Sequence, residues 1–237
     1  MHTGAGVLFI VKNYSGDLMN FEMAAEMCEV PNATVRVNDD VAVENSSYTT
    51  GRRGVAGTVI VEKLVGSLAE SSADLERCRA FGERVVTNIA SMGVAFSSCT
   101  VPAAGKPTFA IGDDEIEIGV GIHGEPGRRR ARIEPADAIV DELLTAIVGE
   151  LEPAADAQLL VLVNGLGGTP LSELYLLFNS ASAWLAQRGL KIARAQVGSP
   201  TTSLDMAGAS LTVCSFDAEM IRHWDSPVHT PALRWGR

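Results

Sequence analysis

The chain has 237 residues, of which 46% are hydrophobic, and a formal net charge of −10. This length and apolar content suffice for one large or two small domains with a buried core. The negative charge argues against nucleic acid or an anionic membrane surface as the main partner. The dense basic stretches GRR at 51–53 and RRRAR at 128–132 are interpreted as solvated loops.

Cysteine spacing and hydropathy narrow the class of protein further. The four cysteines are far apart and form no C-x-x-C pair, so they give no support to a zinc site or a redox dithiol. No apolar run approaches the about 18 residues that a membrane span needs. The first apolar run, VLFIV at 7–11, lacks a basic leader and is too short for a signal peptide. We therefore expect a soluble, cytoplasmic protein with reduced thiols.

The first half of the chain predicts a βαβ unit followed by helices. VLFIV (7–11) has the pattern of a fully buried strand, and NYSGD (13–17) is typical of a loop. A helix is predicted from Leu18 to Glu29 with Asp17 as its N-cap, followed by a strand at 33–37. This order favours a parallel sheet. Further on, the sequence predicts a polar loop at 38–53, helices at about 54–70 and 74–92, and a strand at 93–102.

The stretch at 102–115 holds two prolines, two glycines and acidic residues, which indicates a domain boundary. We expect an incomplete first α/β domain at 1–107 and a second at 108–237. The second half predicts strands at 115–122, 158–163, 190–198 and 209–216, and helices at 134–150 and 171–189. The expected fold class is α/β, with two layered domains whose mixed or mostly parallel sheets are flanked by helices.

The segment GIHGEPG at 121–127 contains His123, one of four histidines. GVGIHG (119–124) matches G-x-G-x-x-G, but the proline and glycine that follow disfavour the helix that a dinucleotide site requires. His-Gly-Glu also matches half of a zinc deaminase motif, whose P-C-x-x-C half is absent. Two interpretations stay open: a loop histidine bonded to nearby backbone, or an imidazole at a strand end that meets a small carbonyl ligand.

Other polar residues are placed at the carboxyl ends of the predicted strands. Lys12 ends the first strand and Asp17 follows it, at the edge where parallel α/β sheets bind ligands. Asp17 is also explained by capping alone, and Lys12 by reaching solvent. Asp39 and Asp40 follow the second strand and are interpreted as loop carboxylates. The loop NGLGGTP (164–170) either presents N–H groups to an anion or is a tight βα turn.

Several long motifs together resemble a known family. They include FIVKNYSGDLMNFEMAAE, NDDVAVE, YTTGRRGVAGTVIVEKLVG, CTVPAAGKPTF, EIGVGIHGEPG, NGLGGTPLSELY and WDSPVHTPAL. These segments are similar to the dihydroxyacetone-binding subunit of dihydroxyacetone (glycerone) kinases, and the likeness runs over nearly the whole chain.

The resemblance implies a phosphotransferase subunit that acts on an alcohol group and works as a homodimer. By position in the motifs, His123 would bind the ketone carbon of dihydroxyacetone as a hemiaminal, and Lys12 and Asp17 would bind the substrate. Asp17 would accept a proton or hydrogen bond from the attacking hydroxyl. The resemblance places the phosphoryl donor, ATP or a bound ADP with Mg²⁺, on a partner subunit. No nucleotide or metal is expected on this chain, which has no Walker motif.

The sequence also departs from the family pattern. The family carries a further N-terminal segment with a GGGSGHEP-type loop, whose histidine serves as a general base, and no such motif precedes Val7. Three expectations follow from this departure. The chain is most of a kinase subunit, a non-catalytic sensor that captures dihydroxyacetone, or an inactive truncated fragment.

Overall fold

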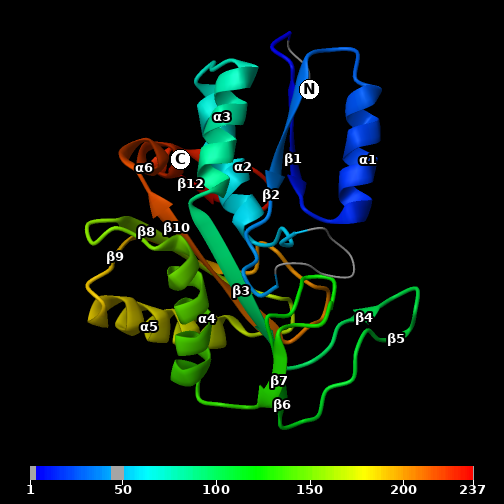
Figure 1. Cartoon of the computed structure of the whole chain (residues 1–237), viewed down its shortest axis with the longest axis vertical. Helices are drawn as coiled ribbons and strands as arrows, with labels where there is room; N and C mark the ends of the chain where they lie inside the picture. Colours follow the sequence, from blue (N-terminus) through cyan, green and yellow to red (C-terminus); the bar gives the residue numbers. More distant parts are fainter. Residues whose placement is uncertain (1–3, 44–50, 237) are drawn as a thin grey trace.

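A computed structural model describes residues 4–43 and 51–236 of the chain. Its centre is a six-stranded mixed sheet with the strand order β7-β6-β3-β10-β8-β9 (Figure 1). The strands are β3 (Ile89–Ala95), β6 (Glu115–Ile118), β7 (Arg129–Arg132), β8 (Gln158–Gly165), β9 (Lys191–Gly198) and β10 (Gly208–Phe216). Only β8 and β9 pair in parallel; the other neighbours are antiparallel. The α/β class is confirmed, and this sheet is mixed rather than mostly parallel.

Helices cover both faces of the sheet because its central strands bury side chains on both sides. Along β8, Leu159, Val161 and Val163 belong to one apolar cluster, whereas Leu160 and Leu162 belong to the other. The first cluster includes residues of α4 (Ala136–Leu151) and α5 (Leu171–Gln187). The second includes residues of α2 (Gly57–Glu70), α3 (Leu75–Val86) and α6 (Ala218–Asp225).

The N-terminal part forms the expected βαβ unit. β1 (Val7–Lys12) and β2 (Asn32–Val37) pair in parallel as a separate two-stranded sheet, and α1 (Ser15–Glu26) connects them. In Figure 1, α1 stands at the edge of the molecule. The prediction of a fully buried first strand was wrong, because β1 is half-buried apart from Val11. The reason is incomplete cover: α1 has no buried residue.

Two boundaries differ from the sequence-based expectation. The first helix begins at Ser15, and Tyr14 rather than Asp17 occupies the N-cap position. The helix predicted at 74–92 ends at Val86, and the following apolar residues from Ile89 onward form β3. Short apolar stretches fit either a buried helix or a buried strand, and pairing with β10 decides for the strand here.

Residues 129–132 of the basic stretch form an edge strand rather than a loop. β7 pairs with β6 through four residue pairs, and Arg129 and Arg130 form ion pairs with Glu142 and Glu117. Charged side chains on an exposed edge strand discourage pairing with other chains.

Two short hairpins complete the described elements: β4 (Thr100–Val101) with β5 (Lys106–Pro107), and β11 (Val228–His229) with β12 (Arg234–Trp235). The domain boundary expected between residues 107 and 108 stays a prediction. β3 precedes that position, yet it pairs with β6 and β10, which follow it. None of the helices in the described ranges combines the length and apolar character needed to cross a membrane.

Candidate functional site

His123 lies on a tight glycine-rich loop that follows β6. Gly119 and Gly124 adopt φ values of +81° and +76°, which side chains with a Cβ disfavour. The turn is closed by a hydrogen bond from the N–H of Gly124 to the carbonyl of Gly121 (3.1 Å). The loop presents the His123 side chain outward with 56% of its surface exposed. The strand expected at 115–122 ends at Ile118, so the imidazole lies on the following loop, where it is accessible to a ligand.

Glu125 fixes the orientation of this imidazole. Its Oε1 lies 3.2 Å from His123 Nδ1, and its Oε2 accepts a hydrogen bond from the His123 backbone N–H at 3.0 Å. Burial pushes the pKa of Glu125 upward, but hydrogen bonds from the His123 ring and from backbone N–H groups outweigh it and lower that pKa. An ionised carboxylate only accepts hydrogen bonds, so its contact with the neutral imidazole requires the proton on Nδ1, and that tautomer leaves the lone pair on Nε2.

Tyr14 packs against the same imidazole from another part of the chain. Its ring meets the His123 ring edge-on, with centroids 4.4 Å apart and planes at 65°. Tyr14 is buried, and its hydroxyl has no hydrogen-bond partner among the described residues. Burial, followed by the charge of Glu125, raises the pKa of this phenol. The contact brings the connection between β1 and α1 to the histidine loop.

The two other residues predicted for the site, Lys12 and Asp17, flank Tyr14 in the sequence. Lys12 is the last residue of β1, and Asp17 lies in the first turn of α1; both are half-buried. The capping role expected of Asp17 was wrong, because the helix begins two residues before it. A carboxylate in the first turn still suits the positive end of the helix dipole. Asp17 is thus available for a role other than capping.

Arg53 and Asp40 form a buried ion pair beneath the histidine loop. Arg53 Nη2 lies 2.6 Å from Asp40 Oδ2, and the two side chains are 0% and 2% exposed. Arg53 also donates to the carbonyls of Gly119 (2.7 Å) and Pro126 (3.4 Å). Burial raises the pKa of Asp40 to about 6, although Arg53 opposes this shift. For Arg53, the interpretation as a solvated loop residue was therefore wrong, and Asp40, interpreted as a loop carboxylate, is buried and ion-paired.

Asp39 is also buried, and it organises the start of α2. Its carboxylate accepts hydrogen bonds from the N–H groups of Val55 (2.7 Å) and Gly57 (2.8 Å) and from the hydroxyl of Ser91. Burial raises its pKa, against these hydrogen bonds. Free N–H groups at a helix start attract such an acceptor. Asp39 lies in the loop after β2, as expected, and its buried carboxylate serves the structure there.

The loop NGLGGTP uses its polar groups within the protein. The N–H groups of Leu166 and Gly168 donate to the carbonyls of Gly208 (3.0 Å) and Met206 (2.8 Å). A Cβ at Gly168 would lie 2.7 Å from the carbonyl oxygen of Asp205. Of the two interpretations left open, these contacts favour a packed βα turn.

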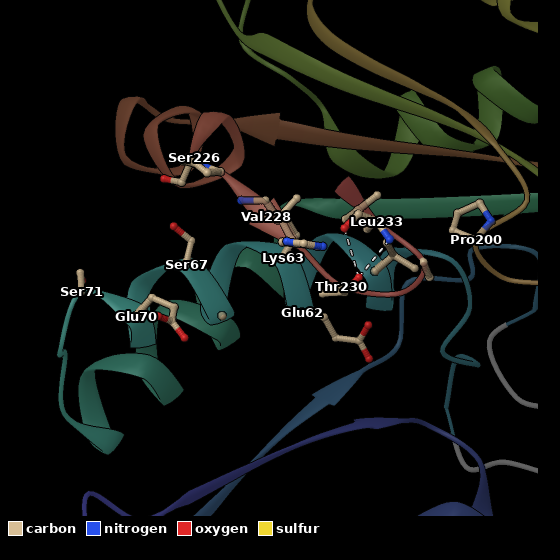
Figure 2. Close-up of a pocket in the computed structure, with 15 residues that line it drawn as sticks. Glu62, Lys63, Ser67, Glu70, Ser71, Pro200, Ser226, Val228, Thr230 and Leu233 are labelled. Carbon is tan, nitrogen blue, oxygen red and sulfur yellow. Dashed lines mark hydrogen bonds between the residues drawn. The ribbon is translucent and has the colours of Figure 1, made fainter. Parts of the chain in front are cut away.

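One cavity of the described residues is lined by none of the histidine-loop residues. It has a volume of about 730 Å³ and lies between α2 and the segment 226–233. Figure 2 shows Lys63 and Ser67 of α2 close to the strand that carries Val228. Lys63 Nζ donates to the carbonyl of His223 at 2.5 Å. Among the described residues, no cluster of three or more His, Cys, Asp or Glu side chains could hold a metal ion.

Sequence reasoning missed Tyr14, Glu125 and Arg53. Glu125 carried a local signal, since it stands two residues after the histidine within the same glycine-rich loop. Tyr14 and Arg53 carried none, because they come from segments distant in sequence.

Comparison with known proteins places this chain in a family. The Dak1 domain matches residues 1–232. A PTS-dependent dihydroxyacetone kinase 1, dihydroxyacetone-binding subunit, from Listeria innocua is 49% identical over 91% of this chain and 67% of its own length. The solved structure of a dihydroxyacetone kinase operon co-activator has a TM-score of 0.89 and 31% identity, covering 95% of this chain and 71% of that one.

A second solved structure is the C. freundii dihydroxyacetone kinase in complex with AMP-PNP and Mg²⁺. It has a TM-score of 0.81 and 32% identity, covering 93% of this chain and 40% of that one. Since the family match spans nearly the whole chain and the Listeria subunit is close in sequence, the chain belongs to the Dak1 domain family.

Proposed function

We propose that this chain is the ketone-binding subunit of a dihydroxyacetone kinase and that it captures dihydroxyacetone covalently on His123. The observation that carries the proposal is the exposed imidazole whose Nδ1 is engaged by Glu125. The printed function of the Listeria relative, a dihydroxyacetone-binding subunit, supports the choice of substrate.

The chemical step uses the free lone pair of Nε2. This nitrogen attacks the ketone carbon, an N–C bond forms, and the carbonyl electron pair moves to the oxygen, which takes up a proton. The imidazole becomes cationic until its Nδ1 proton is released. The Glu125 carboxylate lies 3.2 Å from Nδ1 and stabilises this positive charge as it develops. Glycerol has no carbonyl carbon to attack, so the site selects ketones and aldehydes.

Lys12 and Asp17 bind the captured substrate in this proposal. The Lys12 ammonium holds a substrate oxygen and offsets negative charge. Asp17 accepts the proton of the terminal hydroxyl that becomes phosphorylated. The contribution of the chain is mainly positioning, because the covalent bond fixes the hydroxyl relative to the donor. The donor, ATP or ADP with Mg²⁺, is held on a nucleotide-binding partner subunit, and the ketone-binding subunit works as a cytoplasmic homodimer.

A second candidate function is a sensor that captures dihydroxyacetone without turnover. The likeness to the operon co-activator, with its TM-score of 0.89, favours this alternative. Capture by His123 is common to both functions, whereas phosphoryl transfer belongs only to the first.

The test is carbon NMR of dihydroxyacetone labelled at its carbonyl, mixed with the wild-type chain and with His123→Ala. We expect a tetrahedral-carbon signal with the wild type and none with the variant. The same samples are then mixed with the nucleotide-binding subunit of a dihydroxyacetone kinase and its donor. Formation of dihydroxyacetone phosphate supports the kinase subunit, and capture without product supports the sensor. Absence of the tetrahedral signal from both proteins would refute both functions.

A further inference from the structure

Arg53 joins the two ends of the histidine loop. Its guanidinium donates to the carbonyl of Gly119, four residues before His123, and to that of Pro126, three residues after it. A Cβ at Gly121 would lie 2.8 Å from Arg53 Nη1 and would overlap Glu125 Oε2. The loop therefore wraps around the guanidinium, with Glu125 packed against the same glycine.

Asp40 holds this guanidinium from behind. Its Oδ2 accepts from Arg53 Nε at 2.7 Å, and its Oδ1 accepts from the backbone N–H of Ala42 at 2.9 Å. The backbone N–H of Asp40 in turn donates to the Arg53 carbonyl at 3.0 Å. Both the position and the plane of the guanidinium are thus fixed by groups outside the histidine loop.

The ion pair between Arg53 and Asp40 is unusual in this protein because both of its side chains are buried. Other arginine–carboxylate pairs of the described residues, such as those of Arg52, Arg129 and Arg194, keep both partners partly exposed. A buried ion pair adds little net stability compared with an apolar pair of the same volume. A geometric role explains the buried guanidinium better. Its planar, rigid N–H groups donate to several acceptors in fixed directions, which a lysine ammonium cannot do.

We propose that Arg53, held by Asp40, is the positioning residue that sets the imidazole of His123 for attack on the ketone. The reaction in this inference is the one given under the proposed function. Its geometry comes from the hydrogen bonds of Arg53. Without the guanidinium, the carbonyls of Gly119 and Pro126 lose their common hydrogen-bond donor. The loop then relaxes and shifts Glu125 and the imidazole together.

The test compares Arg53→Lys with Arg128→Lys. Arg128 lies in the same loop region but is exposed, so its variant is the matched control. Affinity for dihydroxyacetone is measured from the tetrahedral-carbon signal. We expect Arg53→Lys to weaken capture about 10- to 100-fold, since a small misplacement of a reacting group has effects of this size. Arg128→Lys should match the wild type.

A second readout needs no ligand. Nitrogen NMR of the unliganded protein, recorded across pH, reports which ring nitrogen of His123 carries the proton. Arg53→Lys should lose the wild-type preference for a protonated Nδ1, whereas a merely structural effect would lower thermal stability without changing it. Tyr14 packs against His123, and the acidic groups that act on Tyr14 are Glu125, Asp40 and Asp39; all four residues are retained in this variant.

The outcomes separate the two proposals. If the wild type captures no dihydroxyacetone, the proposed function fails, and the nitrogen spectra still decide the role of Arg53. If folded Arg53→Lys shows wild-type capture and a wild-type nitrogen profile, the positioning role is wrong. Should Arg53→Lys not fold, Asp40→Asn replaces it: this variant keeps the guanidinium but removes the charge that orients it, and unchanged capture and spectra would overturn the inference.

Discussion

Glu125 contacts His123 at two points: its carboxylate lies within hydrogen-bond distance of both the ring Nδ1 (3.2 Å) and the backbone N–H (3.0 Å) of the histidine. The residue that orients the imidazole therefore also closes the loop that carries it. Glu125 itself is 6% exposed, whereas the His123 side chain is 56% exposed. A buried acceptor thus positions an accessible imidazole.

Glu125→Gln should weaken ketone capture about tenfold at neutral pH. The two N–H groups of His123 face different oxygens of Glu125, and glutamine replaces one of these oxygens by an NH₂ donor. Glutamine also supplies no negative charge to the cationic adduct, and a charged hydrogen bond contributes about 1.5–3 kcal/mol. Titration with labelled dihydroxyacetone measures the effect. Exposed Glu134→Gln is the control, and equal affinity of the Glu125 variant and the wild type would contradict the role of the carboxylate.

The contact between Glu125 and His123 predicts that the free energy of unfolding depends on pH. The pKa of Glu125 is lower in the folded chain than its ordinary value of 4.5. Its contribution is therefore fully present above that ordinary value and is lost as the pH falls through the lower folded value. Urea unfolding of the wild type and Glu125→Gln should show a stability difference that shrinks below about pH 4.5. A difference that stays constant from neutral pH to pH 3 would contradict the shift.

Gly121→Ala should destabilise the fold and the site together. The added Cβ would overlap Glu125 Oε2 and crowd Arg53 Nη1, and forced overlap in a packed region costs about 1–3 kcal/mol. Denaturant unfolding gives the magnitude. Gly66→Ala is the control, because its Cβ meets no atom within 4 Å and should stabilise α2 by about 0.5–1 kcal/mol. A neutral Gly121→Ala would show that the loop accommodates the methyl group.

Tyr14→Phe should leave the contact with His123 intact and raise the free energy of unfolding by about 1 kcal/mol, because the hydroxyl it removes is buried without a partner among the described residues. Tyr14→Leu removes the edge-on ring pair and should lower stability by at least about 1 kcal/mol. Thermal and urea unfolding measure both. A large loss of stability in Tyr14→Phe would mean that the hydroxyl is hydrogen-bonded in solution.

Asp17→Asn separates capture from transfer. The carboxylate is assigned to the attacking hydroxyl and not to the ketone carbon, so the hemiaminal signal should persist. Formation of dihydroxyacetone phosphate with the partner subunit should fall about 100-fold, within the usual range for loss of a general base. Lys12→Met, which removes the ammonium proposed to hold a substrate oxygen, is measured in the same two assays. Full turnover by Asp17→Asn would remove Asp17 from the acid–base role.

Local sequence patterns were enough for much of the secondary structure. Alternation, apolar runs and turn residues placed the βαβ unit, β8, α4, α5 and β10 close to where they lie. The glycines of 119–127 marked a tight loop around His123, and the family followed from long motifs. These features depend on neighbours a few residues away, which is the range over which backbone preferences and side-chain periodicity act.

The environment of the histidine depended on tertiary structure. Arg53 belongs to a basic stretch that was expected in solvent, yet it is buried by a loop 66 residues further along the chain. Tyr14 meets His123 across more than 100 residues. Whether a charged group is solvated or buried is decided by which distant segments cover it and supply partners, and no local pattern encodes that cover. The sequence by itself thus determined most of the elements and the histidine loop, and the packing of distant segments decided how that histidine is held.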